Sequence, residues 1–437
     1  MRVAVVGGGW AGLAAAVEAT AYGHEVVLLE MAPQLGGRAR RIGSDELALD
    51  NGQHVLIGAY AETLRLMRRV GAEPEHLLWR LPLCLAFPDG GVLALSPGAP
   101  AVAFARAVLA RSGWRWRDRL ALLIAAAGWA RQGFCCAPGL TVAQLTSRLP
   151  AAVRAELVEP LCIAALNTPP PLASASVFLR VLHDALFVGP GSADLLLPRV
   201  DLSSLWPQPA ATWLHDAGAE LRLACRVGIV EADAGGWRVD GERFDAVILA
   251  TSAVEAARLA QPVSPAWSAC AGGLRHEPIT TVILRSTGTR LPRPMLALHH
   301  GAAAPAQFVF DLGLLRGIDG ALAFVISGAS EWVERGSAAT VQATLAQART
   351  ALSAHLKSPP QELRTFTEKR ATLLCTPDQL RPAQGIAQGL MAAGDYVAGP
   401  YPSTLEGAVR SGIGAVLAIE SHWPVSGAQT APPAARR

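Results

Sequence analysis

The distribution of apolar and polar positions at the start of the chain predicts a strand, a helix and a second strand. A short apolar run predicts a buried parallel strand at residues 2–6. Residues 11–22 have helical spacing, and a second apolar run predicts a buried strand at 25–30. This unit of about thirty residues is the context in which a glycine-rich turn indicates nucleotide binding. It also explains the N-terminus better than a secretory signal does.

Helical spacing dominates the next part of the chain, at 61–71 and again over 101–166. The longer stretch is broken at Gly113, Gly133 and Pro150. Because it contains no second glycine fingerprint, we expect it to belong to a different domain.

The nucleotide-binding pattern resumes near Leu205. A helix up to Ala217 precedes a predicted strand with Val227 and Ile229, then a hairpin and a buried strand at 246–250. Later segments predict a second sheet and a helix beside it, with strands at 279–285 and 307–328, a helix around 338–356 and a return through 364–374.

Composition narrows the class of protein. Of 437 residues, 51% are hydrophobic and 17% charged, which allows two intertwined domains, a large core and an apolar substrate or membrane surface. The formal charge of +3 does not favour nucleic acid or another polyanion as a partner. Seven scattered cysteines without a CxxC pair indicate reduced thiols in a cytoplasmic protein, and neither a disulfide framework nor a metal site.

The first turn carries the clearest chemistry. Gly7 allows a sharp turn off the strand, Gly9 allows the backbone to approach a pyrophosphate, and Gly12 allows the helix to pack closely on the sheet. Trp10 and Ala11 open the helix, whose N-terminal amides and positive dipole end suit phosphates.

Glu30 ends the second strand, where a carboxylate can accept both ribose hydroxyls of an adenosine. An acid there disfavours a 2′-phosphate, so FAD or NAD is expected rather than NADP. Gly36 and Gly37 then form a tight turn that places Arg38 to meet a phosphate or ribitol oxygen.

The C-terminal part favours a flavin. Asp395, after Gly394, can place a carboxylate on a ribitol hydroxyl, and the segment from Thr404 opens a helix whose amides can face the flavin ring. We therefore predict FAD as cofactor. The expected cofactor-binding residues are Gly7, Gly9, Trp10, Ala11, Gly12, Glu30, Gly36, Gly37, Arg38, Val227, Gly394, Asp395, Thr404, Leu405 and Glu406.

These motifs resemble those of the amine oxidase and phytoene desaturase superfamily of flavoproteins. The shared pattern is GGGxAG, Glu30, GGR, a central strand pair, AGD and TLEGA. Within that superfamily the chain is most similar to the hydroxysqualene dehydroxylases of bacterial hopanoid pathways. The segments that suggest this are 50–54, 161–168 and 399–412.

The resemblance implies an α/β fold with a discontinuous Rossmann-like FAD-binding domain and a mixed α+β substrate domain. It also implies a reaction in which hydroxysqualene, a C30 isoprenoid lipid, loses its hydroxyl as water and gains a hydride to give squalene. No second fingerprint is evident, so the electron donor is not expected to bind as NADPH at a dedicated site on this chain. The expected domains are FAD-binding at 1–60, 202–275 and 385–423, substrate-binding at 61–201 and 276–384, and a disordered tail at 424–437.

Loss of the hydroxyl requires a proton donor. The candidate is His54, in a loop that lies near the flavin ring in the superfamily; the neighbouring pair His183 and Asp184 is the alternative. A structural role is equally open for three of the residues named here: His54 can simply be a hydrogen-bonding residue, Glu406 can serve the start of its helix, and Asn167 can cap a turn.

Residues 101–134 combine tryptophans and arginines with many aliphatic side chains. The apolar run 120–130 is too short to span a bilayer. Arginine and tryptophan beside an apolar helix suit peripheral attachment to the inner face of the cell membrane, which a lipid substrate favours. An ordinary domain helix with a solvated arginine face is the alternative.

Two other readings stay open. One is a carotenoid-type desaturase or an amine oxidase of the same fold. For an amine oxidase, Tyr396 and Tyr401 would have to supply an aromatic cage. The other is a prenyl-binding escort protein without flavin chemistry, which the intact glycine and acid motifs disfavour.

Overall fold

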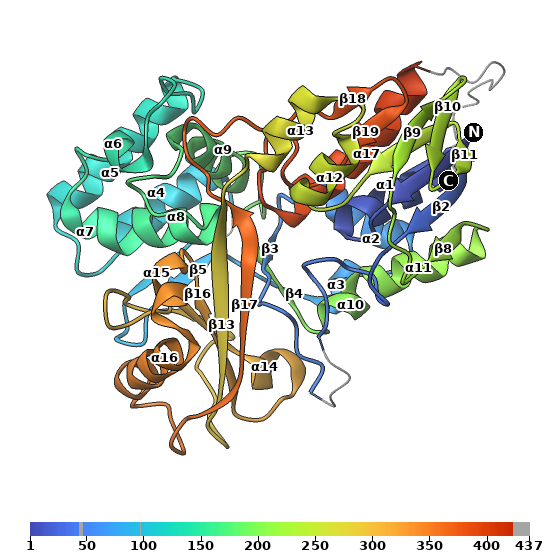
Figure 1. Cartoon of the computed structure of the whole chain (residues 1–437). Coiled ribbons are helices and arrows are strands. Elements are labelled where there is room, and N and C mark those ends of the chain that lie inside the picture. The colour runs from blue at the N-terminus through green and yellow to red at the C-terminus, as the bar shows by residue number, and fades with distance from the viewer. Residues whose placement is uncertain (43–46, 97, 423–437) are drawn as a thin grey trace, which may run out of the picture.

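The computed structural model describes residues 1–42, 47–96 and 98–422 (Figure 1). The predicted disordered tail at 424–437 lies outside the described residues.

The first sheet collects strands from three distant parts of the sequence. β1 lies in its middle and pairs in parallel with β2 on one side and with β12 on the other. The chain therefore leaves β1 on one side and returns on the other, and the carboxyl end of β1 is a switch point where such sheets bind ligands. The strand order is β18 (Gly385–Ala387), β19 (Leu390–Ala392), β12 (Ala246–Leu249), β1 (Arg2–Val6), β2 (Glu25–Leu29) and β8 (Glu220–Arg222).

Both faces of the central strands β2, β1, β12 and β19 are buried, which explains their apolar runs. Val3 and Val5 of β1 face one hydrophobic cluster, whereas Ala4 and Val6 face another. Helices α1 (Trp10–Ala21) and α17 (Leu405–His422) pack together on the first face. Their contact is close, because a Cβ on Gly412 would lie 2.2 Å from the carbonyl oxygen of Ala11.

A small antiparallel sheet and two helices cover the second face. The predicted hairpin is confirmed as β9 and β10, and Trp237 of β10 is buried in this cluster. The elements are β9 (Val230–Asp233), β10 (Gly236–Val239), β11 (Glu242–Phe244), α12 (Ala253–Ala260) and α13 (Pro265–Gly272).

One strand prediction in this region is wrong. Val227 and Ile229 precede β9 and lie outside any strand. The carboxylate of Asp240 accepts the backbone N–H groups of Gly228 and Ile229, at 3.0 and 2.8 Å. These amides are therefore bound by a side chain instead of a neighbouring strand.

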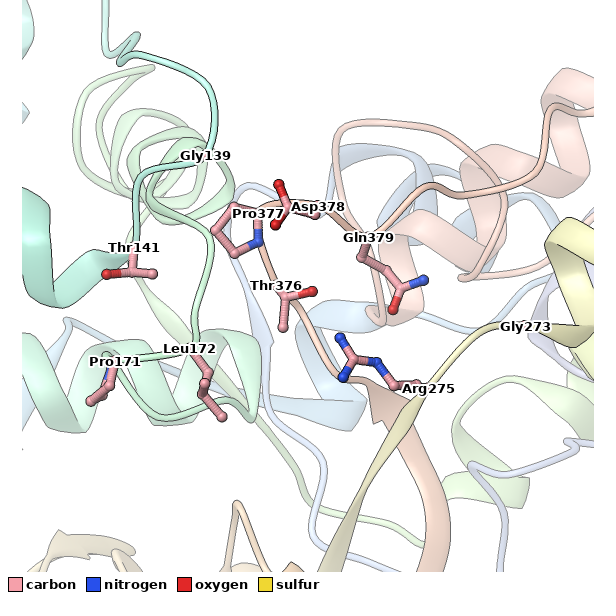
Figure 2. Close-up of a pocket in the computed structure, with 10 residues that line it drawn as sticks. All are labelled: Gly139, Thr141, Pro171, Leu172, Gly273, Arg275, Thr376, Pro377, Asp378 and Gln379. Atoms are coloured by element: carbon pink, nitrogen blue, oxygen red, sulfur yellow. The ribbon is translucent and has the colours of Figure 1, made fainter.

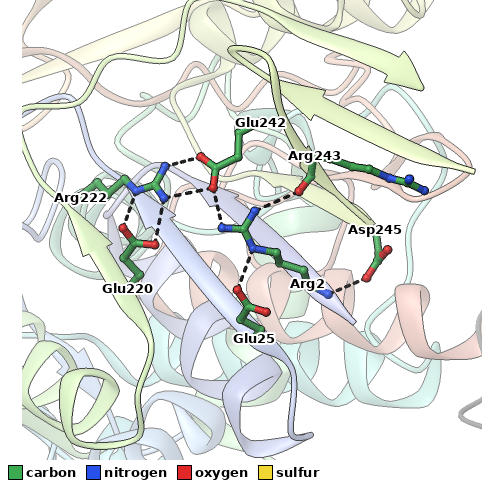
Figure 3. Close-up of polar contacts among 7 residues, drawn as sticks. All are labelled: Arg2, Glu25, Glu220, Arg222, Glu242, Arg243 and Asp245. Atoms are coloured by element: carbon green, nitrogen blue, oxygen red, sulfur yellow. Dashed lines mark hydrogen bonds and ion pairs between the residues drawn. The ribbon is translucent and has the colours of Figure 1, made fainter. Parts of the chain in front are cut away.

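A polar network ties β1, β2 and β8 of the first sheet to β11 (Figure 3). Arg2 donates to Glu25 at 2.7 Å and also to Glu242, which accepts from Arg222 as well. Hydrogen bonds from Arg222 and Arg2 lower the pKa of Glu242 to about 2. The side chains are partly exposed, so the network is expected to add only modest stability.

The second sheet is antiparallel and carries the strands predicted at 279–285 and 307–328. Its longest pairing joins β13 to β17, which ends beside the first sheet (Figure 1). Helix α16 (Ser337–Ala351) packs on one face of it. The order is β14 (Met295–Ala297), β15 (Phe308–Asp311), β16 (Ala321–Ile326), β13 (His276–Arg285) and β17 (Gln361–Leu373).

The stretch predicted as helical is confirmed, with breaks at Gly113, Gly133 and Pro150. Its helices pack on the other face of the second sheet, where Phe104 and Phe178 share a cluster with Phe310. They are α4 (Pro100–Ala110), α5 (Trp116–Arg131), α6 (Val142–Leu145), α7 (Ala151–Val153), a π-helical turn Arg154–Val158, α8 (Glu159–Leu166) and α9 (Ala175–Leu186).

Asn167 fastens this helical part to the second sheet. It ends α8 in the left-handed conformation, with φ +46°. Its amide donates to Thr372 Oγ1 at 2.9 Å and accepts the N–H of Gly328 at 2.7 Å. Asn167 is therefore a helix cap and a bridge between elements.

Short elements connect these layers. They are β3 (Leu56–Ile57), α2 (Ala61–Arg69), α3 (Pro74–Leu77), β4 (Leu78–Leu81), β5 (Cys84–Ala86), β6 (Val92–Ala94), β7 (Leu195–Pro198), α10 (Leu202–Leu205), α11 (Pro207–Asp216), α14 (Leu312–Arg316) and α15 (Ser330–Arg335). Across the part of the chain that the structure describes, no helix is both long and apolar enough to cross a membrane.

Candidate functional site

Two glycine turns meet at the carboxyl end of β1. Gly7 has φ +111°, and a Cβ there would lie 2.5 Å from the carbonyl oxygen of Ala250 at the end of β12. Gly36 donates its N–H to the carbonyl of Gly8 at 2.8 Å, so the second turn docks on the first. Gly37 follows with φ +59°. The sequence predicted the turn at Gly7 and the turn at Gly36 as separate features, whereas in the structure they are hydrogen bonded to each other.

The start of α1 is arranged to receive an anion. Gly9 precedes the helix and has no side chain to occupy its free amides. The nearest atom to a Cβ built on Gly9 is the Cα of Gly37, 3.8 Å away, so the backbone is approachable there. Trp10 and Ala11 are buried, and the indole of Trp10 donates to the carbonyl of Ala39 at 3.0 Å.

Glu30 lies beside this turn. One carboxylate oxygen accepts the N–H of Gly8 at 2.6 Å, and the other accepts that of Ala32 at 2.7 Å. Each oxygen keeps a second lone pair for a ligand hydroxyl. Val227 is buried in the same cluster as Leu29, and its carbonyl accepts from Arg258 at 2.8 Å.

The structure pairs two residues that were expected to face the cofactor independently. The guanidinium of Arg38 forms an ion pair with the carboxylate of Asp395. It also donates to the carbonyls of Arg370 and Ala371 in β17, both at 2.9 Å. Next to Asp395, Gly394 donates its N–H to Ser411 at 2.9 Å. The N- and C-terminal motifs therefore meet directly.

The start of α17 is capped by Thr404, whose hydroxyl accepts the N–H of Gly407 at 2.9 Å and donates to the carbonyl of Tyr401 at 3.0 Å. Leu405, the first helical residue, packs against the first hydrophobic cluster.

Glu406 serves a different helix from the one it belongs to. Its carboxylate is fully buried and accepts the N–H groups of Glu62 and Thr63, at 3.1 and 2.9 Å, in the first turn of α2. It also accepts from the Thr63 hydroxyl at 2.7 Å and from Arg410 at 2.6 Å. We therefore assign Glu406 to capping α2, and the contact to the cofactor predicted for it stays a prediction.

His54 is half-buried and lies close to Arg38 and Arg316. Its Nδ1 lies 3.1 Å from the carbonyl oxygen of Gly52. Burial lowers the pKa of His54, and the positive charges of Arg38 and Arg316 lower it further. The imidazole is therefore mainly neutral at pH 7, with Nδ1–H donated to Gly52 and the lone pair on Nε2.

The alternative acid pair lies on α9. Asp184 is buried and accepts from Arg180 and His183, both at 2.6 Å. It is also hydrogen bonded to Tyr401, and its pKa is lowered: these hydrogen bonds outweigh a burial that alone would raise it. Tyr401 stands between the guanidinium groups of Arg180 and Arg410, 5.7 and 5.1 Å from its ring centre.

Several buried polar atoms have no hydrogen-bond partner within the described residues. Three belong to the neighbourhood of His54, namely Asn51 Oδ1, Gln53 Nε2 and Thr281 Oγ1, and a fourth is the Tyr396 hydroxyl. Such atoms cost free energy unless a ligand or water satisfies them. Together with the open glycine cradle at Gly9, they fit a site for FAD.

Sequence reasoning missed the partner that fixes the His54 loop. Asp50 is buried, accepts the N–H of Leu202 at 2.9 Å and forms an ion pair with Arg316 of α14. The DNGQH segment marked Asp50, but no pattern marks Arg316, because it lies 266 residues away.

A cavity of about 340 Å³ opens elsewhere, between the loop after β17 and the helical part (Figure 2). Its lining includes Arg275, Asp378 and Gln379, and none of the predicted cofactor residues. This polar lining does not suit a hydrocarbon chain.

Comparison with known proteins shows the family of the chain. The model of flavin-containing amine oxidoreductases matches residues 10–419. The chain belongs to this family. Its members contain flavin, so the protein is an FAD-dependent oxidoreductase.

Individual relatives agree with the resemblance seen in the motifs. A hydroxysqualene dehydroxylase of Sinorhizobium fredii is 27% identical over 94% of this chain and 96% of its own. A zeta-carotene desaturase of Synechocystis sp. is 43% identical, but over only 17% of this chain and 15% of its own. An oxidoreductase of Methanosarcina mazei has the same fold, with a TM-score of 0.71 at 16% identity over 95% of this chain and all of the other.

We expect Glu30→Ala to weaken FAD binding by about tenfold or more, because a charged hydrogen-bond acceptor is lost. Retained flavin is measured by absorbance after gel filtration. Glu220→Ala, at an exposed acid of the adjacent strand β8, is the matched control and should keep its flavin. Full occupancy in Glu30→Ala would contradict the site.

We expect the His54 imidazole to titrate below 6.5, as measured by histidine NMR with His54→Gln identifying the signal. The pKa is lower in the folded than in the unfolded state, so stability should fall as pH drops below 6.5. His54→Gln should lose part of that acid sensitivity. A pKa at or above 6.5 would contradict the neutral imidazole described here.

Proposed function

We propose that the protein reductively removes the hydroxyl of hydroxysqualene to give squalene, at the inner face of the cell membrane. The observation that carries the proposal is the convergence of the three segments that resemble hydroxysqualene dehydroxylases. Asn167 donates to the hydroxyl of Thr372 in β17. The hydroxyl of Thr168 accepts the N–H of Cys375, just after that strand, at 3.0 Å. Ser403 accepts the N–H of Leu373 at 2.8 Å.

Segment 50–54 also lies close to the second sheet. A Cβ on Gly52 would lie 3.6 Å from the His54 ring and 3.9 Å from the hydroxyl of Thr281 in β13. Segments 50–54, 161–168 and 399–412 are thus gathered around β13 and β17, beside Arg38 and Asp395. This arrangement supports a shared role in one site.

The proposed reaction breaks one C–O bond. The oxygen takes up a proton and leaves as water, and the carbon gains a hydride. FAD in its reduced form supplies that hydride when bound. The chain must exclude water and deliver the proton. His54 would deliver this proton only as the imidazolium, with Nδ1–H donated to the carbonyl of Gly52 and the transferable proton on Nε2.

The amine oxidase reading is disfavoured by the surroundings of the two tyrosines. The guanidinium groups of Arg180 and Arg410 already lie 5.7 and 5.1 Å from the centre of the Tyr401 ring, so this ring is not free to receive an ammonium substrate. Tyr396 is buried in the cluster on the second face of the first sheet. The two tyrosines therefore do not form the open aromatic cage that an amine would need.

The test is anaerobic incubation of photoreduced holoenzyme with hydroxysqualene. We expect squalene to form while the absorbance of oxidised flavin returns. A phytoene-type polyene and an amine are tested as comparison substrates. Return of flavin absorbance should slow in His54→Gln if His54 carries the proton. Failure to form squalene would contradict the dehydroxylase, and oxidation of the polyene or the amine by oxidised enzyme would establish the alternatives. A purified protein without flavin absorbance would instead indicate an escort protein.

A further inference from the structure

Helix α5 presents large apolar side chains to solvent along one face. Trp116, Leu120 and Ile124 are 66%, 43% and 63% exposed. They follow each other at intervals of four residues, so they form one stripe along the helix. We call these three residues the α5 stripe.

This stripe is not needed for the packing of the helix. The other side of α5 is already buried through Leu122 and Ala126 in the cluster that underlies the helical part. The neighbouring helix α4 also exposes apolar residues, Val102 at 49% and Leu109 at 41%. Exposed apolar residues gathered on adjoining helices indicate a contact with another apolar phase.

The exposed charged side chains around the α5 stripe are arginines, so the exposed charge there is positive. Asp118 is the acidic residue of α5, and its carboxylate is buried and accepts the N–H of Arg115 at 3.1 Å. Arg111 and Arg119 are engaged by Glu156 and by backbone carbonyls. The arginines that remain exposed are Arg106, Arg115, Arg117 and Arg131, although Arg117 also lies 3.9 Å from the Asp118 carboxylate.

We propose that the α5 stripe docks on a bilayer that contains anionic phospholipid. Apolar side chains with a tryptophan would enter the boundary between headgroups and acyl chains, while the exposed arginines meet lipid phosphates. Attachment of this kind lies in the plane of the surface and requires no spanning helix. The docking proposal rests on the proposed function in one respect: an isoprenoid substrate would be supplied from a membrane.

The helical part of the chain is suited to this placement. In Figure 1, α5 lies at the outer edge of the molecule, on the side away from the six-stranded sheet. Docking through α5 would therefore leave the strands and turns around Gly7 and Glu30 off the bilayer. The α5 stripe belongs to the part of the chain predicted to bind the substrate.

The test is co-sedimentation of FAD-loaded full-length protein with vesicles, without substrate. Vesicles of phosphatidylcholine alone are compared with vesicles that also contain phosphatidylglycerol, at low and high salt. The stripe variant is W116S/L120S/I124S, and its matched control is L223S/I229S, at exposed apolar residues outside the helical part. The charge variant is R117E/R131E, with R349E on the exposed side of α16 as control.

We expect binding that requires phosphatidylglycerol and weakens at high salt. The stripe variant should bind at least about tenfold more weakly. The charge variant should lose about fivefold or more for each arginine, and both controls should bind like the unaltered protein. Flavin absorbance and thermal unfolding of each variant report folding.

Equal binding by the stripe variant and the unaltered protein would overturn the proposal. It would also be overturned if sedimentation analysis showed a dimer that the stripe variant abolishes, because the stripe would then contact a second copy of the chain. Squalene formation from detergent-dispersed substrate separates the two proposals. Turnover without vesicle binding would remove the docking and leave the dehydroxylase, whereas binding without turnover would do the reverse.

Discussion

An ion pair between Arg38 and Asp395 joins two segments that are 357 residues apart, and the candidate site depends on it. The same guanidinium holds two carbonyls of β17, so it connects the second glycine turn, the second sheet and the returning chain. The Asp395 side chain is 11% exposed and that of Arg38 39% exposed. Removing Arg38 would leave the Asp395 carboxylate poorly solvated, which costs more than the intact pair contributes.

Buried carboxylates elsewhere in the site also hold backbone amides in place. Glu30 holds Gly8 and Ala32, Glu406 holds the start of α2, and Asp50 holds Leu202. Each binds a turn or helix start of another segment, so the loops around the site are fixed before any ligand enters. Preorganisation of this kind lets a site bind and orient a ligand without a large ordering cost.

Local patterns predicted the elements whose cause is local. The β1–α1–β2 unit follows from apolar periods and glycines within thirty residues of the start, and the breaks at Gly113 and Pro150 follow from backbone chemistry. The strand predicted with Val227 and Ile229 is wrong because Asp240, which lies beyond the next hairpin strand and outside the pattern, accepts the amides of Gly228 and Ile229.

The site was only partly predictable for the same reason. The motifs named Arg38, Asp395 and Glu406, but their partners lie hundreds of residues away, so the ion pair and the capping of α2 could not be derived. The lowered pKa of His54 arises from burial and from Arg316, neither of which is visible in the loop's own residues. The glycine and acid motifs supplied the cofactor, the resemblance supplied the subfamily, and the structure supplied the contacts between segments.

The most direct test is a double-mutant cycle on FAD affinity with Arg38→Met, Asp395→Asn and the double variant, measured by flavin fluorescence. If the pair closes the flavin site, each single change weakens FAD binding. The double change then costs about as much as either single one, with a coupling of at least about tenfold. Unchanged FAD affinity in the single variants, or losses that simply add, would contradict the account.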